Sequence, residues 1–283
     1  MKVRFYGVRG SIPTPGSATV RYGGNTVCVD VQLVDGTRVI LDGGTGIREL
    51  GEHLLLLKDA LEAPITLLLT HLHWDHIMGI PFFGPMYRKE THIRIHSLST
   101  EVQRSTVRQR ALFDGIHFPV RAADLPARVD FLEEQSSPLR VGSATVRRVL
   151  LNHPGGAQGF RIDDSDGRSL AYLTDNELSP PGDVQTSLDA LARFAEGVDM
   201  MIHDAQYVEA DMPAKRGWGH STFDDVLRLA QKAAPRRLVA FHHDPSREDR
   251  ALDALGAYAE HWLHERKSDT VAVVAREGWR TEL

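Results

Sequence analysis

The stretch Thr70-His71-Leu72-His73-Trp74-Asp75-His76 directly follows the apolar run Ile65-Thr66-Leu67-Leu68-Leu69. An apolar run of this length, preceded by Pro64 and followed by polar residues, is typical of a buried strand in a sheet that is covered on both faces. The histidines are therefore expected to lie at the end of a strand.

Three imidazoles and one carboxylate within six residues form a set of nitrogen and oxygen donors that suits zinc, manganese or iron. The alternative is a polar turn whose histidines are only solvated or capping. Alternate side chains of an extended segment point in opposite directions, so the four groups cannot all reach one ion. The stretch predicts a metal site, with two ions rather than one.

Length and composition set broad limits on the protein. With 283 residues, 42% hydrophobic and 25% charged, the chain can bury a sizeable core as one large domain or two small ones. The formal net charge of -5 argues against a surface built for long nucleic acid and is compatible with small anionic substrates. The single cysteine, Cys28, excludes a disulfide framework. Because no signal peptide and no run of membrane-spanning length is present, we expect a cytoplasmic protein.

Hydrophobic periodicity predicts the elements around the histidine stretch. Strands are expected at residues 25–33, 38–41, 141–151, 160–162, 169–173 and 270–274, and helices at residues 47–57, 100–113, 223–234 and 248–265. Asp35-Gly36 and residues 163–167 are expected to form hairpin turns. The Arg-rich helix at residues 100–113 would face solvent.

Further polar residues come where predicted strands end. Asp42, Asp175, Asp204 and His242 all have this position. Two of them also have plain structural alternatives, because Asp42 could be a turn former and Asp175 a helix N-cap. His242 is followed by His243, and alternation along a strand lets only one of the two reach a shared site.

Two loops carry further candidates. Residues 7–16 form a loop rich in glycine and proline, which could bring backbone amides close to an anion or act only as a stiff turn. Residues 113–120 combine aromatic residues with a histidine in an irregular segment. We expect His117 and Phe118 either at a substrate pocket or in a hydrophobic plug.

Five separate motifs, in order along the chain, resemble the metallo-β-lactamase superfamily of binuclear hydrolases. The opening Gly7-Val8-Arg9-Gly10-Ser11-Ile12-Pro13-Thr14-Pro15 and the later Gly219-His220-Ser221-Thr222 are similar to its phosphodiesterase branch, which includes tRNase Z and small cyclic-phosphate phosphodiesterases. This resemblance covers nearly the whole chain. It implies an α/β fold, a four-layer αββα sandwich of two mixed β-sheets flanked by helices, as a single domain over residues 1–283.

The resemblance also implies a set of metal ligands. One ion would be held by His71, His73 and His153, the other by Asp75, His76 and His242, and Asp175 would bridge the two. The ions are expected to be Zn²⁺, with Mn²⁺ as the alternative. Asp42 is implied to orient a ligating histidine through a hydrogen bond.

A reaction follows from the same resemblance. Two ions roughly 3.5 to 4 Å apart would hold a hydroxide as the nucleophile, and Asp75 would help to orient it. His220 is implied to act as a general acid or to stabilise the charge that develops, with Asp204 fixing its imidazole. The His220 motif favours phosphodiester cleavage, because β-lactamases and glyoxalase-type thioesterases lack it.

The expected substrate is a small phosphodiester, especially a cyclic nucleotide. The alternative is tRNA 3′ processing, as in tRNase Z, but residues 156–173 are too short for the long glycine-rich arm with which tRNase Z grips tRNA. A second alternative, of another class, is a metal-bound sensor or binding protein without turnover. Because relatives commonly pair, we also expect a homodimer.

Overall fold

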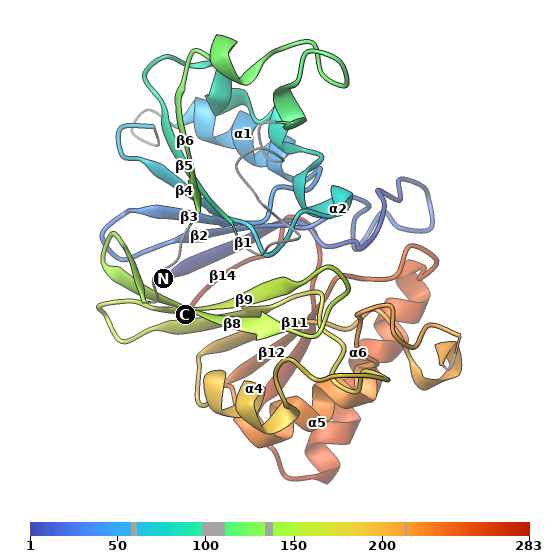
Figure 1. Cartoon of the computed structure of the whole chain (residues 1–283). Coiled ribbons are helices and arrows are strands. Elements are labelled where there is room, and N and C mark those ends of the chain that lie inside the picture. Colours follow the sequence, from blue (N-terminus) through green and yellow to red (C-terminus); the bar gives the residue numbers. More distant parts are fainter. Residues whose placement is uncertain (58–60, 98–110, 134–137, 213) are drawn as a thin grey trace.

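Two β-sheets lie face to face at the centre of the computed structural model, which describes residues 1–57, 61–97, 111–133, 138–212 and 214–283 (Figure 1). The first sheet has seven strands, in the order β14 (Arg280–Glu282), β1 (Lys2–Gly7), β2 (Cys28–Gln32), β3 (Arg38–Leu41), β4 (Ile65–Leu68), β5 (His92–Ser97) and β6 (Arg128–Glu133). The second sheet also has seven, in the order β13 (Val271–Val274), β12 (Arg237–Phe241), β11 (Met200–Asp204), β10 (Ser169–Leu173), β9 (Ala157–Asp163), β8 (Ala144–Leu151) and β7 (Leu139–Val141).

Helices cover the outer faces of both sheets. Helix α1 (Ile47–Leu56) lies on the first sheet, whereas α4 (Leu188–Phe194), α5 (Phe223–Ala233) and α6 (Asp249–Glu265) lie on the second (Figure 1). The shorter helices are α2 (Trp74–Ile77) and the 3₁₀ turns Ile80–Phe82, Gly84–Tyr87, Ala111–Phe113, Ala122–Asp124 and Glu209–Asp211. The predicted four-layer αββα fold is confirmed. Among the described residues, every helix is too short or too polar to cross a bilayer.

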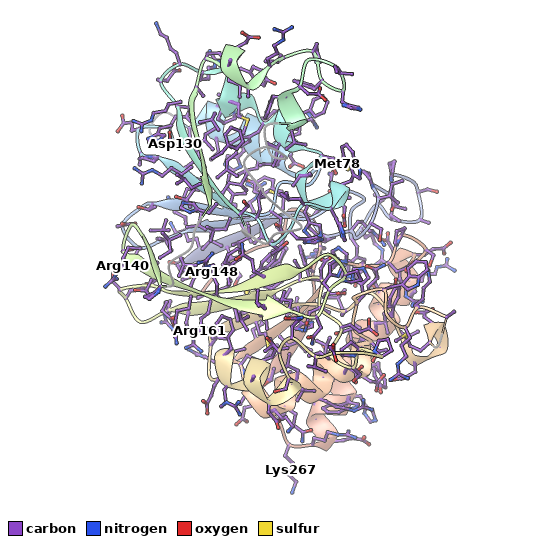
Figure 2. The ribbon with its side chains drawn as sticks, viewed as in Figure 1. Met78, Asp130, Arg140, Arg148, Arg161 and Lys267 are labelled. Atoms are coloured by element: carbon purple, nitrogen blue, oxygen red, sulfur yellow. The ribbon has the colours of Figure 1, made fainter. Side chains whose placement is uncertain are left out.

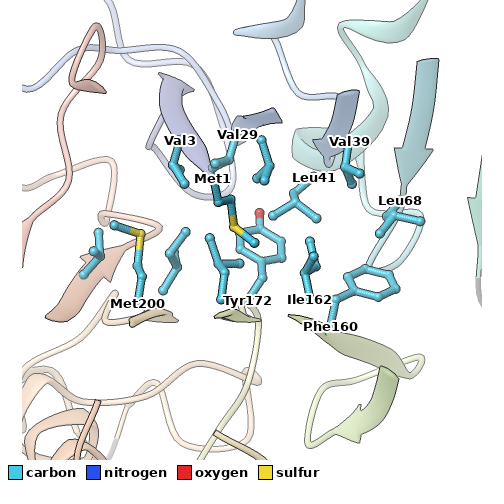
Figure 3. Packing of buried hydrophobic residues seen from close by; sticks show 14 of the residues in the cluster. Met1, Val3, Val29, Val39, Leu41, Leu68, Phe160, Ile162, Tyr172 and Met200 are labelled. Carbon is cyan, nitrogen blue, oxygen red and sulfur yellow. The ribbon is translucent and has the colours of Figure 1, made fainter. Parts of the chain in front are cut away.

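Alternation along the strands builds three layers of core. Val29 of β2 and Met200 of β11 point into the space between the sheets (Figure 3). Val31 and Ile202 belong to the same buried cluster. Met201, the residue between Met200 and Ile202, points to the opposite face and packs against the helices of the second sheet. Because side chains alternate with a period of two, a strand that is covered on both faces must be apolar throughout. This explains the continuous apolar runs in the sequence.

Strand direction brings several strand ends to one edge of the sandwich. Strands β3, β4, β5 and β6 run parallel to one another, as do β10, β11, β12 and β13. Strand β8 runs in the same direction as β10, because both are antiparallel to β9. Figure 2 shows Met78, just after α2, on one side of the molecule and Arg140 of β7 on the other. The candidate residues at strand ends therefore meet at one edge, next to α2.

The predicted elements are observed with small shifts at their ends. The helices predicted at residues 47–57, 223–234 and 248–265 correspond to α1, α5 and α6. The segment predicted as one strand pair, residues 141–151, holds the end of β7, a turn and β8. The helix predicted at residues 100–113 falls mainly outside the described residues, and its last three residues form a 3₁₀ turn.

Candidate metal centre

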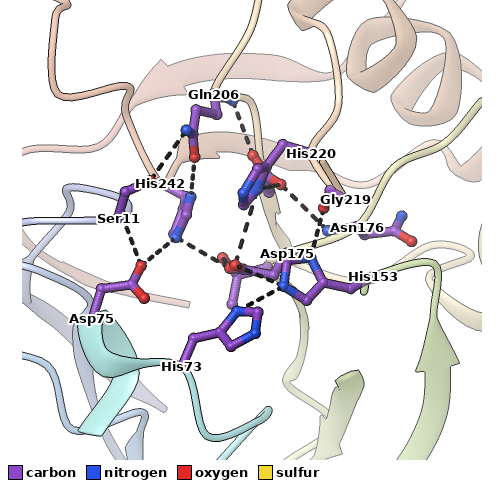
Figure 4. Close-up of polar contacts among 12 residues, drawn as sticks. Ser11, His73, Asp75, His153, Asp175, Asn176, Gln206, Gly219, His220 and His242 are labelled. Atoms are coloured by element: carbon purple, nitrogen blue, oxygen red, sulfur yellow. Dashed lines mark hydrogen bonds and ion pairs between the residues drawn. The ribbon is translucent and has the colours of Figure 1, made fainter. Parts of the chain in front are cut away.

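Two adjoining groups of donor atoms lie at the shared edge of the sheets (Figure 4). The first group contains His71, His73, His153 and Asp175, and the second contains Asp75, His76, Asp175 and His242. Within each group, the ligating atoms lie within 4.8 Å of one another. The structure thus brings together all seven residues that the sequence proposes as ligands, and it places Asp175 in both groups.

The histidine stretch divides between the two groups for a reason that differs from the one expected. Residue His73 is extended, with φ -66° and ψ 152°, and it precedes α2. Asp75 and His76 therefore project from a helical turn, whereas the sequence reasoning treated the whole stretch as extended. The prediction of two sites agrees with this geometry, but alternation along one extended segment is the wrong explanation for it.

Three of the strand-end residues have an unusual backbone conformation. Asp42, Asp175 and His242 follow β3, β10 and β12, and their φ angles are 58°, 60° and 58°. A residue other than glycine in this left-handed region costs of order 1–3 kcal/mol and persists only where its surroundings impose it. The same turn recurs at three strand ends, and all three side chains are buried. Such strain is typical of functional sites.

Asp42 orients one histidine of each donor group. Its Oδ2 accepts a hydrogen bond of 2.9 Å from Nδ1 of His76 and another of 2.9 Å from the hydroxyl of Tyr172. The Thr70 hydroxyl donates to the same carboxylate and lies 3.0 Å from Nδ1 of His71, from which it accepts. Both imidazoles are thereby fixed with Nε2 as the nitrogen that faces the donor groups.

The other two buried ligand candidates are oriented in the same way. Nδ1 of His153 donates to the carbonyl oxygen of Gly219 at 2.9 Å, and Nδ1 of His242 donates to Oε1 of Gln206 at 2.8 Å. Their Nε2 atoms lie 3.8 and 3.2 Å from the Asp175 carboxylate. A hydrogen bond on one ring nitrogen leaves the lone pair of the other for a metal.

The loop of residues 7–16, rich in glycine and proline, also contributes to the site. The backbone N–H of Ser11 donates to Oδ2 of Asp75 at 2.7 Å. A Cβ atom on Gly10 would lie 2.4 Å from the ring of His242, so this backbone lies directly against the second group. The loop is therefore next to the site, and one of its amides holds a carboxylate of the site.

Two observations show that the residues present fit a divalent cation. The Nε2 atoms of His71 and His76 are buried and make no hydrogen bond, although Asp175 oxygens lie 3.7 and 3.1 Å away. Burial would lower the pKa of His76, yet Asp175, Asp75 and Asp42 raise it well above its usual value, because the carboxylates create an excess of negative charge. Imidazole and carboxylate donors suit zinc and manganese.

In the first group the net shift of the histidine pKa values is downward, because burial outweighs the carboxylates. Burial lowers the pKa of His71 and His73 and brings the pKa of His153 to about 4, although Asp175 acts against it. These imidazoles are therefore neutral at pH 7, which is the state that binds a metal. The structure has a divalent metal site at this edge.

His220 and Asp204 form a buried pair beside these groups. Nδ1 of His220 donates to Oδ2 of Asp204 at 2.8 Å, and the His220 ring stacks on His242 with centroids 5.0 Å apart. Burial lowers the pKa of His220, but the carboxylates of Asp204 and Asp175 outweigh burial and raise it to about 9. The pair thus places an imidazole that is held by a carboxylate next to the donor atoms.

Several histidines are kept away from the site. His243 donates from Nε2 to the carbonyl oxygen of Ala275 at 2.8 Å, which leaves His242 as the member of the adjacent pair in the donor group. His203 is buried and hydrogen-bonded to Asn176 and to the carbonyl oxygen of Asp204. It is a core histidine and belongs to neither donor group.

His117 and Phe118 do not join the donor groups. The His117 side chain is 77% exposed and pairs with Asp114 at 2.6 Å, whereas Phe118 packs edge-on against Phe82. Both line a cavity of about 480 Å³ that also borders Trp74 of α2. They line a cavity, but no described contact joins them to the donor groups, and their place at a substrate pocket stays a prediction.

Four residues near the site were not singled out by sequence reasoning. Ser11 contacts Asp75, and Tyr172 contacts Asp42. Glu177 contacts the Gly217–Gly219 loop, and Gln206 contacts His242. All four contacts join segments that are far apart in the chain. Gln206 had one usable signal, because it lies two residues beyond Asp204 at a strand end.

A methyl group at Gly219 is expected to displace His153. Gly219 has φ +86°, and a Cβ atom there would lie 2.2 Å from Nδ1 of His153. We therefore expect Gly219→Ala to weaken metal binding by about 10- to 100-fold, measured by competition with a chelator. Gly167→Ala is the matched control, because Gly167 has φ +84° with nothing within 4 Å. Equal affinities in the two variants would contradict the role of this contact.

The fold and the site together define a metal-dependent hydrolase of the metallo-β-lactamase fold, which is of the α/β class. The chain belongs to the beta-lactamase superfamily domain family, whose model matches residues 37–243. The predicted family and the prediction of a metal-dependent hydrolase are confirmed at this level.

Three comparisons illustrate what the chain is similar to. It is 27% identical over 231 residues to the uncharacterized protein Rv1339 of Mycobacterium tuberculosis, covering 75% of this chain and 72% of that one. It is 21% identical over 295 residues to ribonuclease Z of Thermoplasma acidophilum, covering 89% of each. The crystal structure of a diphosphatase from the PhnP family superposes with a TM-score of 0.68 at 21% identity, covering 100% of this chain and 97% of that one.

Proposed function

We propose that this protein is a binuclear metal-dependent phosphodiesterase that hydrolyses a small phosphodiester, most of all a cyclic nucleotide. The observation that carries the proposal is the His220–Asp204 pair beside two donor groups that share Asp175. Cleavage of a phosphodiester needs a nucleophile, compensation of charge on the phosphate and a proton for the leaving oxygen. We assign residues of the site to each of these tasks.

The donor groups would hold the ions. His71, His73 and His153 would bind one ion and Asp75, His76 and His242 the other, with Asp175 shared between them. We propose zinc, with manganese as the alternative. When bound, two divalent ions supply an activated water as the nucleophile and offset the charge of the phosphate.

The protein's own residues would orient the water and move the proton. Oδ2 of Asp75 is fixed by the N–H of Ser11 and lies 3.1 Å from Nε2 of His242, so this carboxylate is in place to orient the attacking water. Nδ1 of His220 is occupied by Asp204, which leaves Nε2 to donate a proton to the leaving oxygen. Burial of this pair excludes competing water.

Two observations support a small substrate. Residues 157–173 form the hairpin of β9 and β10 within the second sheet, so this segment is not available as an extended arm. The net charge of -5 also disfavours long polyanions. The similarity to ribonuclease Z over 89% of each chain favours tRNA 3′ processing as the second candidate function.

The test is a panel of phosphodiesters with the zinc- or manganese-loaded protein. The panel contains bis(p-nitrophenyl) phosphate, 2′,3′-cyclic and 3′,5′-cyclic nucleotides, and a tRNA precursor. Turnover of a cyclic nucleotide would support the proposal, whereas cleavage of the tRNA precursor alone would replace it with the second candidate. A fully metal-loaded protein that cleaves none of them would contradict both and favour a metal-bound sensor.

A further inference from the structure

Glu177 is a buried carboxylate two residues beyond Asp175, and neither donor group contains it. Its side chain accepts hydrogen bonds from the backbone N–H of Gly217, at 2.9 and 3.0 Å, and from the N–H of Gly219, at 2.9 Å. The residue is 2% exposed. Within the described part of the chain, all hydrogen bonds found for this side chain come from backbone N–H groups.

A carboxylate at this position has a specific chemical reason. Both of its oxygens accept hydrogen bonds and neither donates, so it can satisfy two amides at once. Gly217 and Gly219 have φ angles of +85° and +86°, a left-handed conformation that glycine adopts without strain. Burial of a charge is costly unless hydrogen bonds compensate it. A glutamine in place of Glu177 would turn its NH₂ group toward one of these backbone N–H groups, so that two donors would face each other.

The loop that Glu177 holds contacts both histidine systems of the site. The carbonyl oxygen of Gly219 accepts the hydrogen bond from Nδ1 of His153, which determines the nitrogen that faces the first donor group. The next residue is His220, and Figure 4 shows His220 and His153 on either side of Gly219. Their ring centroids are 5.3 Å apart. A shift of this loop would therefore move both imidazoles.

The backbone of Glu177 is anchored to the segment that carries His153. The N–H of Glu177 donates to the carbonyl oxygen of Asn152 at 2.9 Å, and Nδ2 of Asn152 donates to the carbonyl oxygen of Glu177 at 3.1 Å. Glu177 thus connects its own segment, which carries Asp175, to the segments that carry His153 and His220. These three segments are far apart in the chain. A side chain at such a junction can fix their relative positions.

We propose that Glu177 is a positioning residue, which holds the Gly217–Gly219 loop so that His153 presents Nε2 to the first metal and His220 faces the leaving oxygen. The kinetic part of this inference rests on the proposed phosphodiesterase function, whereas the structural part does not. Glu177 does not touch the substrate. It acts through the loop.

The test compares Glu177→Gln with Glu196→Gln, a control in which the same change is made at an exposed glutamate. Nitrogen-15 NMR of labelled histidines in the zinc-loaded proteins reports the imidazole nitrogens directly. Two kinetic substrates are used, a cyclic nucleotide with an alkoxide leaving group and bis(p-nitrophenyl) phosphate, whose leaving group departs without a proton. Glu177→Asp, which keeps the charge and shortens the reach, replaces the glutamine variant if the latter does not fold.

The proposal expects changes in the His153 and His220 signals in Glu177→Gln and none in Glu196→Gln. It also expects kcat for the cyclic nucleotide to fall by about 10- to 100-fold, with a smaller fall for the nitrophenyl ester. Unchanged imidazole signals, or an undiminished kcat for the cyclic nucleotide, would overturn it. If the wild-type protein cleaves neither ester, the proposed function fails, and the NMR signals still decide the positioning role.

Discussion

His220→Ala is expected to lower kcat for a cyclic nucleotide by about 10²- to 10⁴-fold, the usual contribution of a general acid. His220 lies beside both donor groups, and Asp204 keeps its Nδ1 occupied. An alkoxide is a poor leaving group without a proton, so loss of the imidazole should affect the chemical step. Steady-state kinetics of the metal-loaded variant would measure the change.

Metal content distinguishes the acid from a ligand. Asp204, His220 and His242 also have ligating atoms within 4.8 Å of one another, so a metal-binding role for His220 is the competing explanation. As an acid, its loss should leave two ions per chain and affect bis(p-nitrophenyl) phosphate much less than the cyclic nucleotide. His264→Ala, at an exposed position in α6, is the control. Loss of an ion from His220→Ala would contradict the assignment.

Asp175→Asn is expected to reduce bound metal from two ions to at most one per chain and to slow turnover by on the order of 10³-fold or more. Burial raises the pKa of Asp175, but His242 and His76 hold it well below its usual value, so the side chain is a carboxylate. The negative charge of a shared ligand offsets the repulsion between two cations. A neutral amide removes that charge and keeps the shape.

Asparagine is the informative substitution at this position. Asp175 has φ 60°, and asparagine is among the few residues that adopt this conformation readily. The fold should therefore survive, and far-ultraviolet circular dichroism would verify it. Asp166→Asn, in the exposed turn between β9 and β10, is the control and should retain both ions, as measured by plasma mass spectrometry. Two ions and an undiminished rate in Asp175→Asn would exclude a shared ligand.

Much of the fold could be predicted because its signals are local. The buried strands β4, β10, β11 and β12 are apolar runs, and Thr222 before α5 is a hydrogen-bonded N-cap. The polar residues that follow these runs are recognisable because functional side chains collect where parallel strands end. The strand-end positions of His71, Asp175 and His242 were recognised in this way, whereas the resemblance to the family implied the full set of ligands.

Contacts between distant segments could not be predicted. Strand β14 is three residues long and exists because it pairs with β1 across nearly the whole chain. Glu177 has no local pattern that separates it from ordinary loop residues, and the place of Gln206 near a strand end does not reveal its contact with His242. The backbone turns at Asp42 and Asp175 also appear only in the structure. The homodimer, the cytoplasmic location and the single-domain organisation stay predictions.

The most direct measurement of the central claim is a titration of metal-stripped protein with zinc, followed by hydrolysis of a cyclic nucleotide and of bis(p-nitrophenyl) phosphate. A phosphodiesterase whose two donor groups share Asp175 should be inactive when stripped and should reach full activity at two equivalents of zinc per chain. Full activity at one equivalent, or activity in the stripped protein, would contradict a two-ion reaction at this site.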